Sequence, residues 1–356
     1  MNLLIVSQYF YPESFRINDL AVQLVKRGHQ VTVLSGTPNY PSGSFFSGYG
    51  WFKRTEEVIQ GVRVIRVPVI PRMKGRGWQL ALNYFSFAFF GSLLAPLKIR
   101  GKVDAILVYQ VSPATMGIPA VVVKRLKSAK LFFWVQDIWP ETLSAMGAIR
   151  SPFILRKIGS LVSWLYRQSD YVLGQSEAFL PAIIKRGVPS NRALYFPNSA
   201  EALYRPVEKS SATEVGAQLP QGFKVMFAGN IGIAQDIESI VKAAEILKKN
   251  LDVKWIIIGQ GSMHAWLRQE IINRGLENHI FLLGQHPVDK MPEFFSQADL
   301  LLATLKKDPI FEKVIPSKIQ SYLACGKAIV ASIIGGHLRK GNDILINVIF
   351  TKLHFT

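Results

Sequence analysis

Several features that commonly define a protein's chemistry are scarce or absent in this sequence. Its 356 residues include one cysteine, Cys325, which excludes an internal disulfide framework and is typical of a reducing compartment. The six histidines lack the His-x-x-x-His or Cys/His spacing of a zinc site. Neither a P-loop nor a complete G-x-G-x-x-G motif is present, which disfavours an ATPase or a hydride-transfer enzyme. We therefore expect neither a bound metal nor a cofactor.

Acidic residues are also scarce. The chain has 24 Asp and Glu against 42 Lys and Arg, a formal net charge of +18. Such a surplus favours an anionic partner, which could be nucleic acid, lipid headgroups or a phosphorylated substrate. No helix-turn-helix, zinc-finger or RNA-binding aromatic signature is present, so we expect no nucleic-acid partner. A phosphorylated substrate and a membrane surface remain.

One apolar run is long enough to cross a bilayer. Residues 77–97 carry no charge over 21 residues, and basic residues flank both ends. Gln79, Asn83 and Pro96 interrupt the run. Three interpretations stay open: a buried or edge helix of a soluble domain, a helix lying in the membrane interface, and a true membrane span.

The first half of the chain alternates strand-like and helix-like segments. Strands are predicted at 3–7, 31–34, 105–109 and 131–135, and helices at 17–27 and 114–126. This alternation is typical of a parallel sheet wrapped by helices, an α/β fold. The polar stretch 198–222 lacks periodic apolar positions and is predicted to be a linker. We expect one domain at 1–200.

The same rhythm restarts after the linker. Strands are predicted at 224–228, 254–258, 280–283 and 300–304, and helices at 237–248, 263–274, 291–296 and 317–324. This pattern predicts a second doubly wound domain at 201–333. Such sheets bind ligands outside the carboxyl ends of their strands, so we expect the site in a cleft between the two domains.

Two glycine-containing turns follow strands of the second domain, Gly229-Asn230-Ile231-Gly232 and Gly259-Gln260-Gly261. Glycine lets the backbone approach a phosphate closely. Plain strand-to-helix turns explain the same glycines equally well.

The segment from Pro316 to Lys327 predicts a helix start. Proline in the first turn needs no intrahelical hydrogen bond, and Ser317 has a side chain that can satisfy free backbone donors there. The amides at that end and the helix dipole attract anions, and Lys318 adds a full positive charge. A diphosphate suits this end; the alternative is an ordinary capped helix with a solvated lysine.

Carboxylates in the first half are candidates for acid–base or acceptor-orienting work. Asp137 follows a predicted strand and precedes Trp139-Pro140, which places it at a carboxyl-end loop. It could equally cap the next helix. Glu13, Arg16 and Asn18 follow the first strand in an equivalent loop.

Short motifs in order along the chain resemble one enzyme family. Together they resemble the retaining glycosyltransferases of family 4, which have the GT-B fold, and within them the bacterial L-fucosamine transferase type of O-antigen and capsule assembly. The resemblance implies two Rossmann-like domains facing across a cleft. The motifs are Tyr9-Phe10-Tyr11-Pro12-Glu13, Arg27-Gly28-His29-Gln30-Val31-Thr32-Val33-Leu34, Pro38-Asn39-Tyr40-Pro41, Gln136-Asp137-Ile138-Trp139-Pro140-Glu141, Phe196-Pro197-Asn198, Gly229-Asn230-Ile231-Gly232 and Pro316–Lys327.

The resemblance implies transfer of a sugar, with retained configuration, from a UDP-sugar to a lipid-linked saccharide. The sugar it suggests is an N-acetylated amino sugar such as N-acetyl-L-fucosamine, and the process is O-antigen, lipopolysaccharide, capsule or exopolysaccharide biosynthesis. The enzyme would be peripheral on the cytoplasmic face of the bacterial plasma membrane, without a metal. Catalysis would rest on Lys318 and Asp137. The other implied contacts are Gly229, Asn230, Gly232 and Ser317 for the diphosphate, Gly284, Gln285, His286, Val288 and Ser321 for the base and ribose, and Glu13, Arg16 and Asn18 for the acceptor.

The chain departs from the family pattern in three places. Asn230 and Gln235 stand where many members carry a basic pair, and Ser321 stands where a glutamate contacts the donor ribose. Residues 334–356 match nothing in the family, which predicts a frameshifted or truncated second domain. An alternative function follows, namely an inactive homologue that binds a nucleotide-sugar or a partner without turnover.

Overall fold

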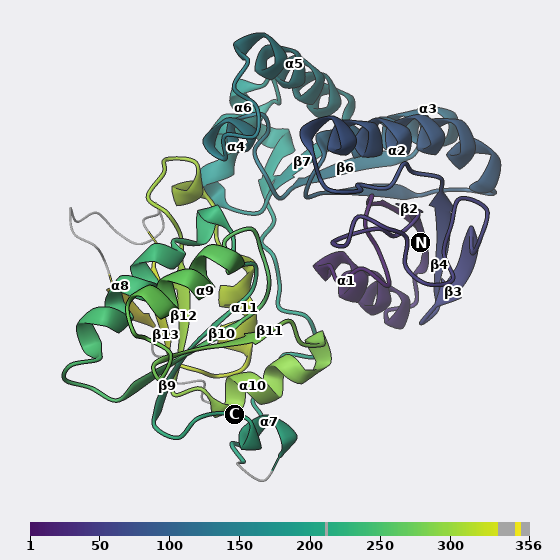
Figure 1. Cartoon of the computed structure of the whole chain (residues 1–356). Coiled ribbons are helices and arrows are strands. Elements are labelled where there is room, and N and C mark those ends of the chain that lie inside the picture. Colours follow the sequence, from purple (N-terminus) through teal and green to yellow (C-terminus); the bar gives the residue numbers. More distant parts are fainter. Residues whose placement is uncertain (211–212, 334–345, 350–356) are drawn as a thin grey trace. The chain divides into compact units, whose positions relative to one another are not determined.

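The computed structural model describes residues 1–210, 213–333 and, for the backbone, 346–349. It divides into two compact units, Met1–Pro197 and Asn198–Thr356. The division falls three residues before the boundary that the sequence predicts after residue 200. Each unit is an α/β domain built around one sheet (Figure 1).

The first unit contains an eight-stranded sheet in the order β3-β4-β2-β1-β5-β6-β7-β8. All neighbouring strands in it are parallel except β3, which is antiparallel to β4. The strands are β1 Asn2–Val6, β2 Gln30–Gly36, β3 Glu56–Ile59, β4 Val62–Val67, β5 Ala105–Gln110, β6 Lys130–Val135, β7 Tyr171–Gly174 and β8 Ala193–Tyr195. The helices are α1 Arg16–Lys26, α2 Gly77–Lys98, α3 Gly117–Lys127, α4 Glu141–Ala145, α5 Pro152–Gln168 and α6 Leu180–Lys185, with 3₁₀ turns η1 Ala114–Met116, η2 Glu177–Phe179 and η3 Ser190–Arg192.

The second unit contains a six-stranded sheet in the order β11-β10-β9-β12-β13-β14. Its strands are parallel except β14, which is antiparallel to β13. The strands are β9 Phe223–Ala228, β10 Val253–Ile258, β11 Ile280–Gly284, β12 Leu300–Thr304, β13 Ile329–Ser332 and β14 Ile346–Ile349. The helices are α7 Glu214–Ala217, α8 Ile237–Leu247, α9 His264–Asn273, α10 Met291–Gln297 and α11 Ser317–Ala324, with 3₁₀ turns η4 Ile233–Gln235, η5 Val288–Lys290 and η6 Phe311–Lys313.

The prediction of two doubly wound domains is confirmed. In both sheets the first strand of the unit lies inside the sheet and the strand order reverses beside it, between β1 and β5 and between β9 and β12. Such a reversal opens a crevice at the carboxyl ends of the two strands, where ligands of doubly wound sheets bind. Continuous apolar runs at the centre of each sheet, such as that of β9, are typical of strands covered on both faces.

Side chains of β9 alternate between the two faces of its sheet. Met226 packs in a core with Phe295 of α10 and Tyr322 of α11. Phe227 packs in a second core with Ile240 of α8 and other residues of α8 and α9. Because helices cover both faces, the residues that follow β9 emerge at the edge of a rigid sheet.

The expected loss of the family pattern concerns residues 334–356. Residues 334–345 and 350–356 lie outside the described part of the chain. The backbone of β14 pairs with β13 from Ile329↔Ile349 to Ser332↔Ile346.

Candidate functional site

The loops that follow β9 and β10 interlock through their backbones. The N–H of Gly229 donates to the carbonyl of Ile258 at 2.9 Å, and the N–H of Ile231 donates to Gln260 at 2.9 Å. A Cβ added at Gly259 would lie 1.9 Å from the carbonyl oxygen of Gly229, and only glycine accepts such contact. The close approach of the Gly229 backbone therefore explains why residue 259 is glycine. This favours the interpretation of Gly259-Gln260-Gly261 as a plain strand-to-helix turn.

Lys318, in the first turn of α11, lies against the end of β9. Its Nζ donates to Oε1 of Gln235 at 2.8 Å and lies 3.6 Å from the centroid of the Phe227 ring. A Cβ at Gly229 would stand only 3.3 Å from the same Nζ. The structure therefore places Lys318 close to the glycine loop, and their shared role in one site stays a prediction.

The Lys318 ammonium has neutral neighbours. Burial lowers the pKa of Lys318 to about 7. Within the described residues no carboxylate forms an ion pair with it, and the Gln235 carbonyl and the Phe227 ring face are polar or polarisable without carrying charge. An anion arriving beside Nζ would favour the charged amine, so the site is electrostatically suited to a phosphate group.

Tyr322 holds α11 in register with β9. Its hydroxyl accepts from the N–H of Ala228 at 3.0 Å and donates to the carbonyl of Ala228 at 3.2 Å. The ring is fully buried and meets Phe295 edge to face at 5.0 Å between centroids. Because Tyr322 follows Lys318 by one helical turn, this anchor fixes the distance between Nζ and the Gly229 loop. Sequence reasoning missed Tyr322 as a site residue, and it noted Gln235 only as standing where many family members carry a basic residue.

The start of α11 differs from the expected capping. The helix begins at Ser317, and Pro316 takes the N-cap position, so the proline lies just before the first turn and not within it. The N-cap residue Pro316 makes no side-chain cap hydrogen bond, and the capping expected of Ser317 stays a prediction. The backbone N–H groups of the first helical turn have no partner within the helix itself.

The two other diphosphate candidates differ in exposure. Asn230 is exposed beside Gly229. Gly232 is buried, and a Cβ there would stand 2.5 Å from Nδ2 of Asn230. Gly232 therefore lies on the buried side of the loop, whereas Gly229 and Asn230 lie on its exposed side.

The residues expected around the nucleotide base gather at the carboxyl end of β11. Gly284 ends this strand at φ +74°, and its carbonyl accepts from the N–H of Gly259 at 2.7 Å. Gln285 and Val288 are exposed. The His286 ring packs against Phe294 at 4.5 Å between centroids, and its Nε2 lies 3.1 Å from the carbonyl of Leu283.

Ser321 requires a correction. It lies one turn into α11 and is buried, with 5% of its surface exposed. A short, buried hydroxyl does not present itself to a ribose as a long glutamate side chain would. The expected ribose contact at Ser321 is therefore not supported by its position.

Glu13 in the first unit is a buried structural carboxylate. Its Oε1 accepts from the N–H groups of Asn39 at 2.8 Å and Tyr40 at 2.7 Å, and Oε2 accepts from Phe10 at 3.3 Å. Burial raises the pKa of Glu13 to about 7, while these backbone hydrogen bonds oppose the rise. At 2% exposure Glu13 cannot touch an acceptor, which corrects the expectation of a direct contact.

Asn18 is corrected for the same reason. It is 4% exposed, and its Nδ2 donates to the carbonyl of Glu13 at 2.7 Å. Arg16, at the start of α1, keeps partial exposure. Of the three expected acceptor-side residues, only Arg16 lies where a ligand could reach it.

Asp137 follows β6 and is half-buried. Burial raises the pKa of its carboxyl to about 7. Within the described residues no hydrogen bond to the carboxylate is present, although its backbone carbonyl accepts from Nε2 of Gln110 at 3.2 Å. Asp137 does not cap α4, whose N-cap is Pro140. A carboxyl group with a pKa near neutrality at the carboxyl end of a strand is suited to acid–base chemistry.

A cluster of aromatic rings around Arg72 lies in the loops after β1 and β2. The guanidinium carbon stands 4.9 Å from the ring centroid of Tyr40 and 5.9 Å from that of Tyr9. Phe15 stacks on Tyr9 at 5.1 Å. The Tyr-Phe-Tyr-Pro and Pro-Asn-Tyr-Pro motifs contain two of these rings, but only the fold brings Arg72 to them.

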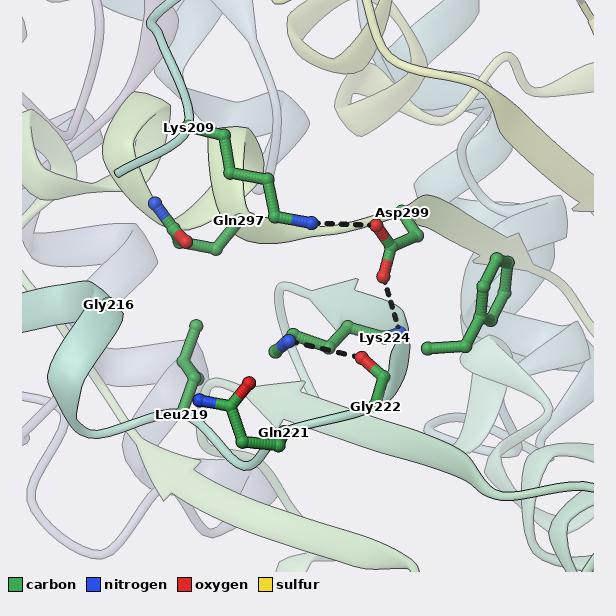
Figure 2. Close-up of a pocket in the computed structure, with 9 residues that line it drawn as sticks. Lys209, Gly216, Leu219, Gln221, Gly222, Lys224, Gln297 and Asp299 are labelled. Atoms are coloured by element: carbon green, nitrogen blue, oxygen red, sulfur yellow. Dashed lines mark hydrogen bonds and ion pairs between the residues drawn. The ribbon is translucent and has the colours of Figure 1, made fainter. Parts of the chain in front are cut away.

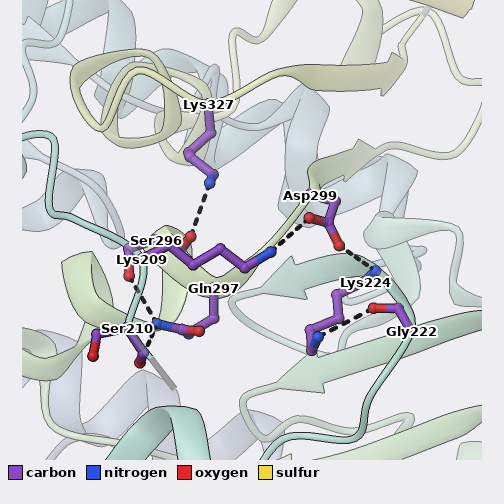
Figure 3. Close-up of polar contacts among 8 residues, drawn as sticks. All are labelled: Lys209, Ser210, Gly222, Lys224, Ser296, Gln297, Asp299 and Lys327. Carbon is purple, nitrogen blue, oxygen red and sulfur yellow. Dashed lines mark hydrogen bonds and ion pairs between the residues drawn. The ribbon is translucent and has the colours of Figure 1, made fainter. Parts of the chain in front are cut away.

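A cavity of about 520 Å³ opens at the opposite end of the second sheet (Figure 2). Asp299, just before β12, accepts from Nζ of Lys209 at 2.8 Å and from the N–H of Lys224 at 2.8 Å. Gln297 donates to the carbonyl of Ser210 at 3.0 Å (Figure 3). These bonds attach the segment that enters the second unit to its sheet, at the amino ends of β9 and β12. Because ligands of doubly wound sheets bind at the carboxyl ends, we assign this cavity a structural role.

Comparison with known proteins identifies the family. Residues 14–199 match the model described as "Glycosyl transferase 4-like domain", and residues 208–339 match "Glycosyl transferases group 1". The Escherichia coli K12 protein WcaI, whose name assigns it to glycosyl transfer in colanic acid biosynthesis, is 27% identical over 92% of this chain and 82% of its own length. The Pseudomonas aeruginosa protein WbjE, named as a glycosyltransferase, is 26% identical over 73% of this chain and 64% of its own length.

The fold is shared with solved structures. The Anabaena protein HepE, in a crystal structure described as a complex with UDP and glucose, superposes with a TM-score of 0.63 at 18% identity. The alignment covers 95% of this chain and 82% of HepE. This likeness, together with the two family matches, confirms the predicted GT-B architecture. The chain belongs to the glycosyl transferase 4-like family and is a glycosyltransferase of the group 1 type.

Proposed function

We propose that this glycosyltransferase uses a UDP-sugar and holds its diphosphate between Gly229 and the start of α11. The observation that carries the proposal is the position of Lys318, whose Nζ lies against the loop after β9 with a neutral hydrogen-bond partner. Structures of HepE described as complexes with UDP and with UDP-glucose support the choice of nucleotide.

Lys318 would act on the leaving group. As the bond from the sugar to the diphosphate breaks, the sugar gains positive charge and the diphosphate gains negative charge. A preorganised cation beside that charge contributes about 3 kcal/mol to transition-state stabilisation. The first-turn amides of α11 add to the same field. This provides charge stabilisation from the chain's own residues, and we propose that transfer proceeds with retention and without a metal.

Asp137 is our candidate for orienting or deprotonating the acceptor. Its half-buried carboxyl has no side-chain partner within the described residues and a pKa raised to about 7. Such a group can take a proton near neutral pH. We propose that the acceptor is a lipid-linked saccharide at the cytoplasmic membrane face, in the assembly of O-antigen, capsule or a related polysaccharide. The name of WcaI, which refers to colanic acid biosynthesis, supports polysaccharide assembly.

An N-acetylated amino sugar such as N-acetyl-L-fucosamine remains our proposal for the donor sugar. It rests on the resemblance in sequence motifs. Exposed Gln285 and Val288, together with His286, are proposed to contact the base.

The proposal is tested by incubating the chain with a panel of UDP-sugars and a polyprenyl-diphosphate-linked saccharide. We expect UDP release and an elongated lipid-linked product with one sugar of the panel, both unchanged by EDTA. Lys242→Met serves as the matched control for Lys318→Met, because Lys242 is exposed on α8 of the same unit. UDP binding without product from any acceptor would support the inactive homologue instead.

A further inference from the structure

Helix α2 buries three polar side chains beside the apolar residues Phe87, Ala88 and Ala95 of its inner face. Gln79, Asn83 and Ser86 are 7%, 0% and 7% exposed. Oδ1 of Asn83 accepts from Gln8 at 2.7 Å, and its Nδ2 donates to the carbonyl of Ile70 at 2.6 Å. The Ser86 hydroxyl accepts from the N–H of Ile70 at 2.9 Å. These bonds hold one polar face of α2 against the loops of the first unit.

The opposite face of α2 is an exposed apolar stripe. Its members recur every three or four residues, which places them along one side of the helix. The face that a surface helix turns to solvent normally carries charged and polar side chains instead. The stripe residues and their exposures are Trp78 59%, Leu82 42%, Phe85 61%, Phe89 64%, Leu93 56% and Leu97 69%.

Cations stand at both ends of the stripe. Lys74 and Arg76 are exposed before the helix, and Arg100 and Lys102 are exposed after it. Lys102 pairs with Asp104 at 2.8 Å, and its side chain is 80% exposed. Apolar and aromatic side chains between exposed cations match a bilayer with anionic headgroups, in which the rings enter the interface and the cations meet phosphates.

We infer that α2 docks the first unit onto an anionic bilayer, lying in the plane of the interface with the stripe of Trp78, Leu82, Phe85, Phe89, Leu93 and Leu97 immersed. The helix has the length and hydropathy to span a membrane, but a third of its apolar window is buried inside the structure. It packs on α3, β2 and β4, and its inner face is bonded to polar groups of the domain (Figure 1). A spanning helix would have to break those bonds, whereas an in-plane helix keeps them.

A second copy of the chain fits the apolar stripe of α2 less well than an anionic bilayer does. Two stripes facing one another would bring the basic ends of both helices together, and like charges in contact oppose association. An anionic membrane neutralises the same charges. The inference deepens the proposed function and rests on it for its purpose, because an enzyme with a lipid-linked acceptor must work at a membrane.

Vesicle sedimentation tests the inference. We expect the full chain to sediment with vesicles of phosphatidylglycerol mixed with phosphatidylcholine, and at least about 10-fold less with phosphatidylcholine alone. The double variant Phe85→Gln/Phe89→Gln is expected to lower the partition coefficient at least about 10-fold. The triple variant Lys74→Gln/Arg76→Gln/Arg100→Gln should lower the partition coefficient by a similar factor, but only on anionic vesicles.

Matched controls separate docking from misfolding. Ile246→Gln/Ile272→Gln removes two apolar side chains that are 71% and 55% exposed in the second unit, and it should sediment as the wild type does. Each variant must retain the wild-type thermal midpoint and UDP affinity. Unchanged sedimentation of the Phe85/Phe89 variant would overturn the inference, as would a dimer in analytical ultracentrifugation that this variant abolishes.

The membrane-docking inference and the proposed transferase function can fail separately. If the chain binds vesicles through α2 but no UDP-sugar is used, the proposed function fails and membrane docking stands. If turnover occurs on a water-soluble acceptor analogue while the stripe variants sediment normally, the docking inference fails and the transferase activity stands.

Discussion

The Nζ of Lys318 donates a 2.8 Å hydrogen bond to Oε1 of Gln235. Gln235 ends the turn η4 after the first strand of the second unit, and Lys318 is the second residue of α11. The hydrogen bond therefore joins two residues that are 83 positions apart in the sequence. Because the partner is a neutral amide, the hydrogen bond orients the Lys318 side chain, and no carboxylate charge offsets the positive charge of the ammonium. This arrangement leads to the first predictions.

Replacing Lys318 should remove most of the catalysis. We expect Lys318→Ala to lower turnover at least about 100-fold, because one preorganised charge contact at the leaving group is worth that much. Turnover is measured by UDP release at saturating donor. Lys242→Met should keep wild-type turnover, and a folded Lys318→Ala chain with near-normal activity would contradict the assignment.

Donor binding should take up a proton. Burial lowers the pKa of free Lys318 to about 7, so at pH 8 the amine is mostly neutral, and the bound diphosphate should raise its pKa again. UDP affinity is then expected to fall as pH rises above 7, by up to about tenfold per unit. Calorimetric titration in buffers of different ionisation enthalpy should show about one proton taken up at pH 8. Lys318→Met should show none; equal uptake by both chains would exclude Lys318 as the source.

The pH profile of turnover should depend on Asp137. Its pKa is raised to about 7 by burial, so the ionised base becomes available as pH rises through that value. At saturating donor the bound diphosphate keeps Lys318 charged, so we expect kcat to rise over this interval in the wild type. Asp137→Asn should lower kcat by about 100-fold or more and flatten the profile, with little change in UDP affinity. A variant that keeps the rising limb would show that another group titrates there.

Glu13 should make stability depend on pH. Its folded pKa, about 7, lies above the value near 4.3 of an unfolded glutamate. A raised pKa means that the folded state holds the proton longer, so the contribution is complete below about pH 4.3 and is lost as pH rises through 7. The thermal midpoint of the wild type should therefore fall, relative to Glu13→Gln, between pH 5 and pH 8. Parallel curves for the two chains would contradict the burial effect.

The sequence predicted the fold and part of the candidate site. Alternating apolar segments predicted eight strands, β1, β2, β5, β6, β9, β10, β11 and β12, but not β3, β4, β7, β8 or β13. The Pro316–Lys327 segment predicted α11 from Ser317 to Ala324. The expectation that Lys318 and the Gly229 turn share a site came from the family resemblance, and the structure places the two close together.

Other residues were beyond prediction for physical reasons. Gln235 reaches Lys318 only through the turn formed by η4 and the left-handed Asp236, a conformation that sequence periodicity does not reveal. Glu13 stands in a polar loop, and nothing in its neighbours in sequence shows that amides of Asn39 and Tyr40 surround it. The sequence of α2 has the composition of a buried helix, so only the packing in the structure shows that one of its faces is an exposed apolar stripe.

A crystal structure of the chain with UDP tests the central claim most directly. The account predicts a diphosphate oxygen within about 3 Å of Nζ of Lys318, with the loop at Gly229 and the first amides of α11 facing the same group. UDP bound elsewhere, for example in the cavity beside Asp299 with Lys318 still bonded only to Gln235, would contradict it.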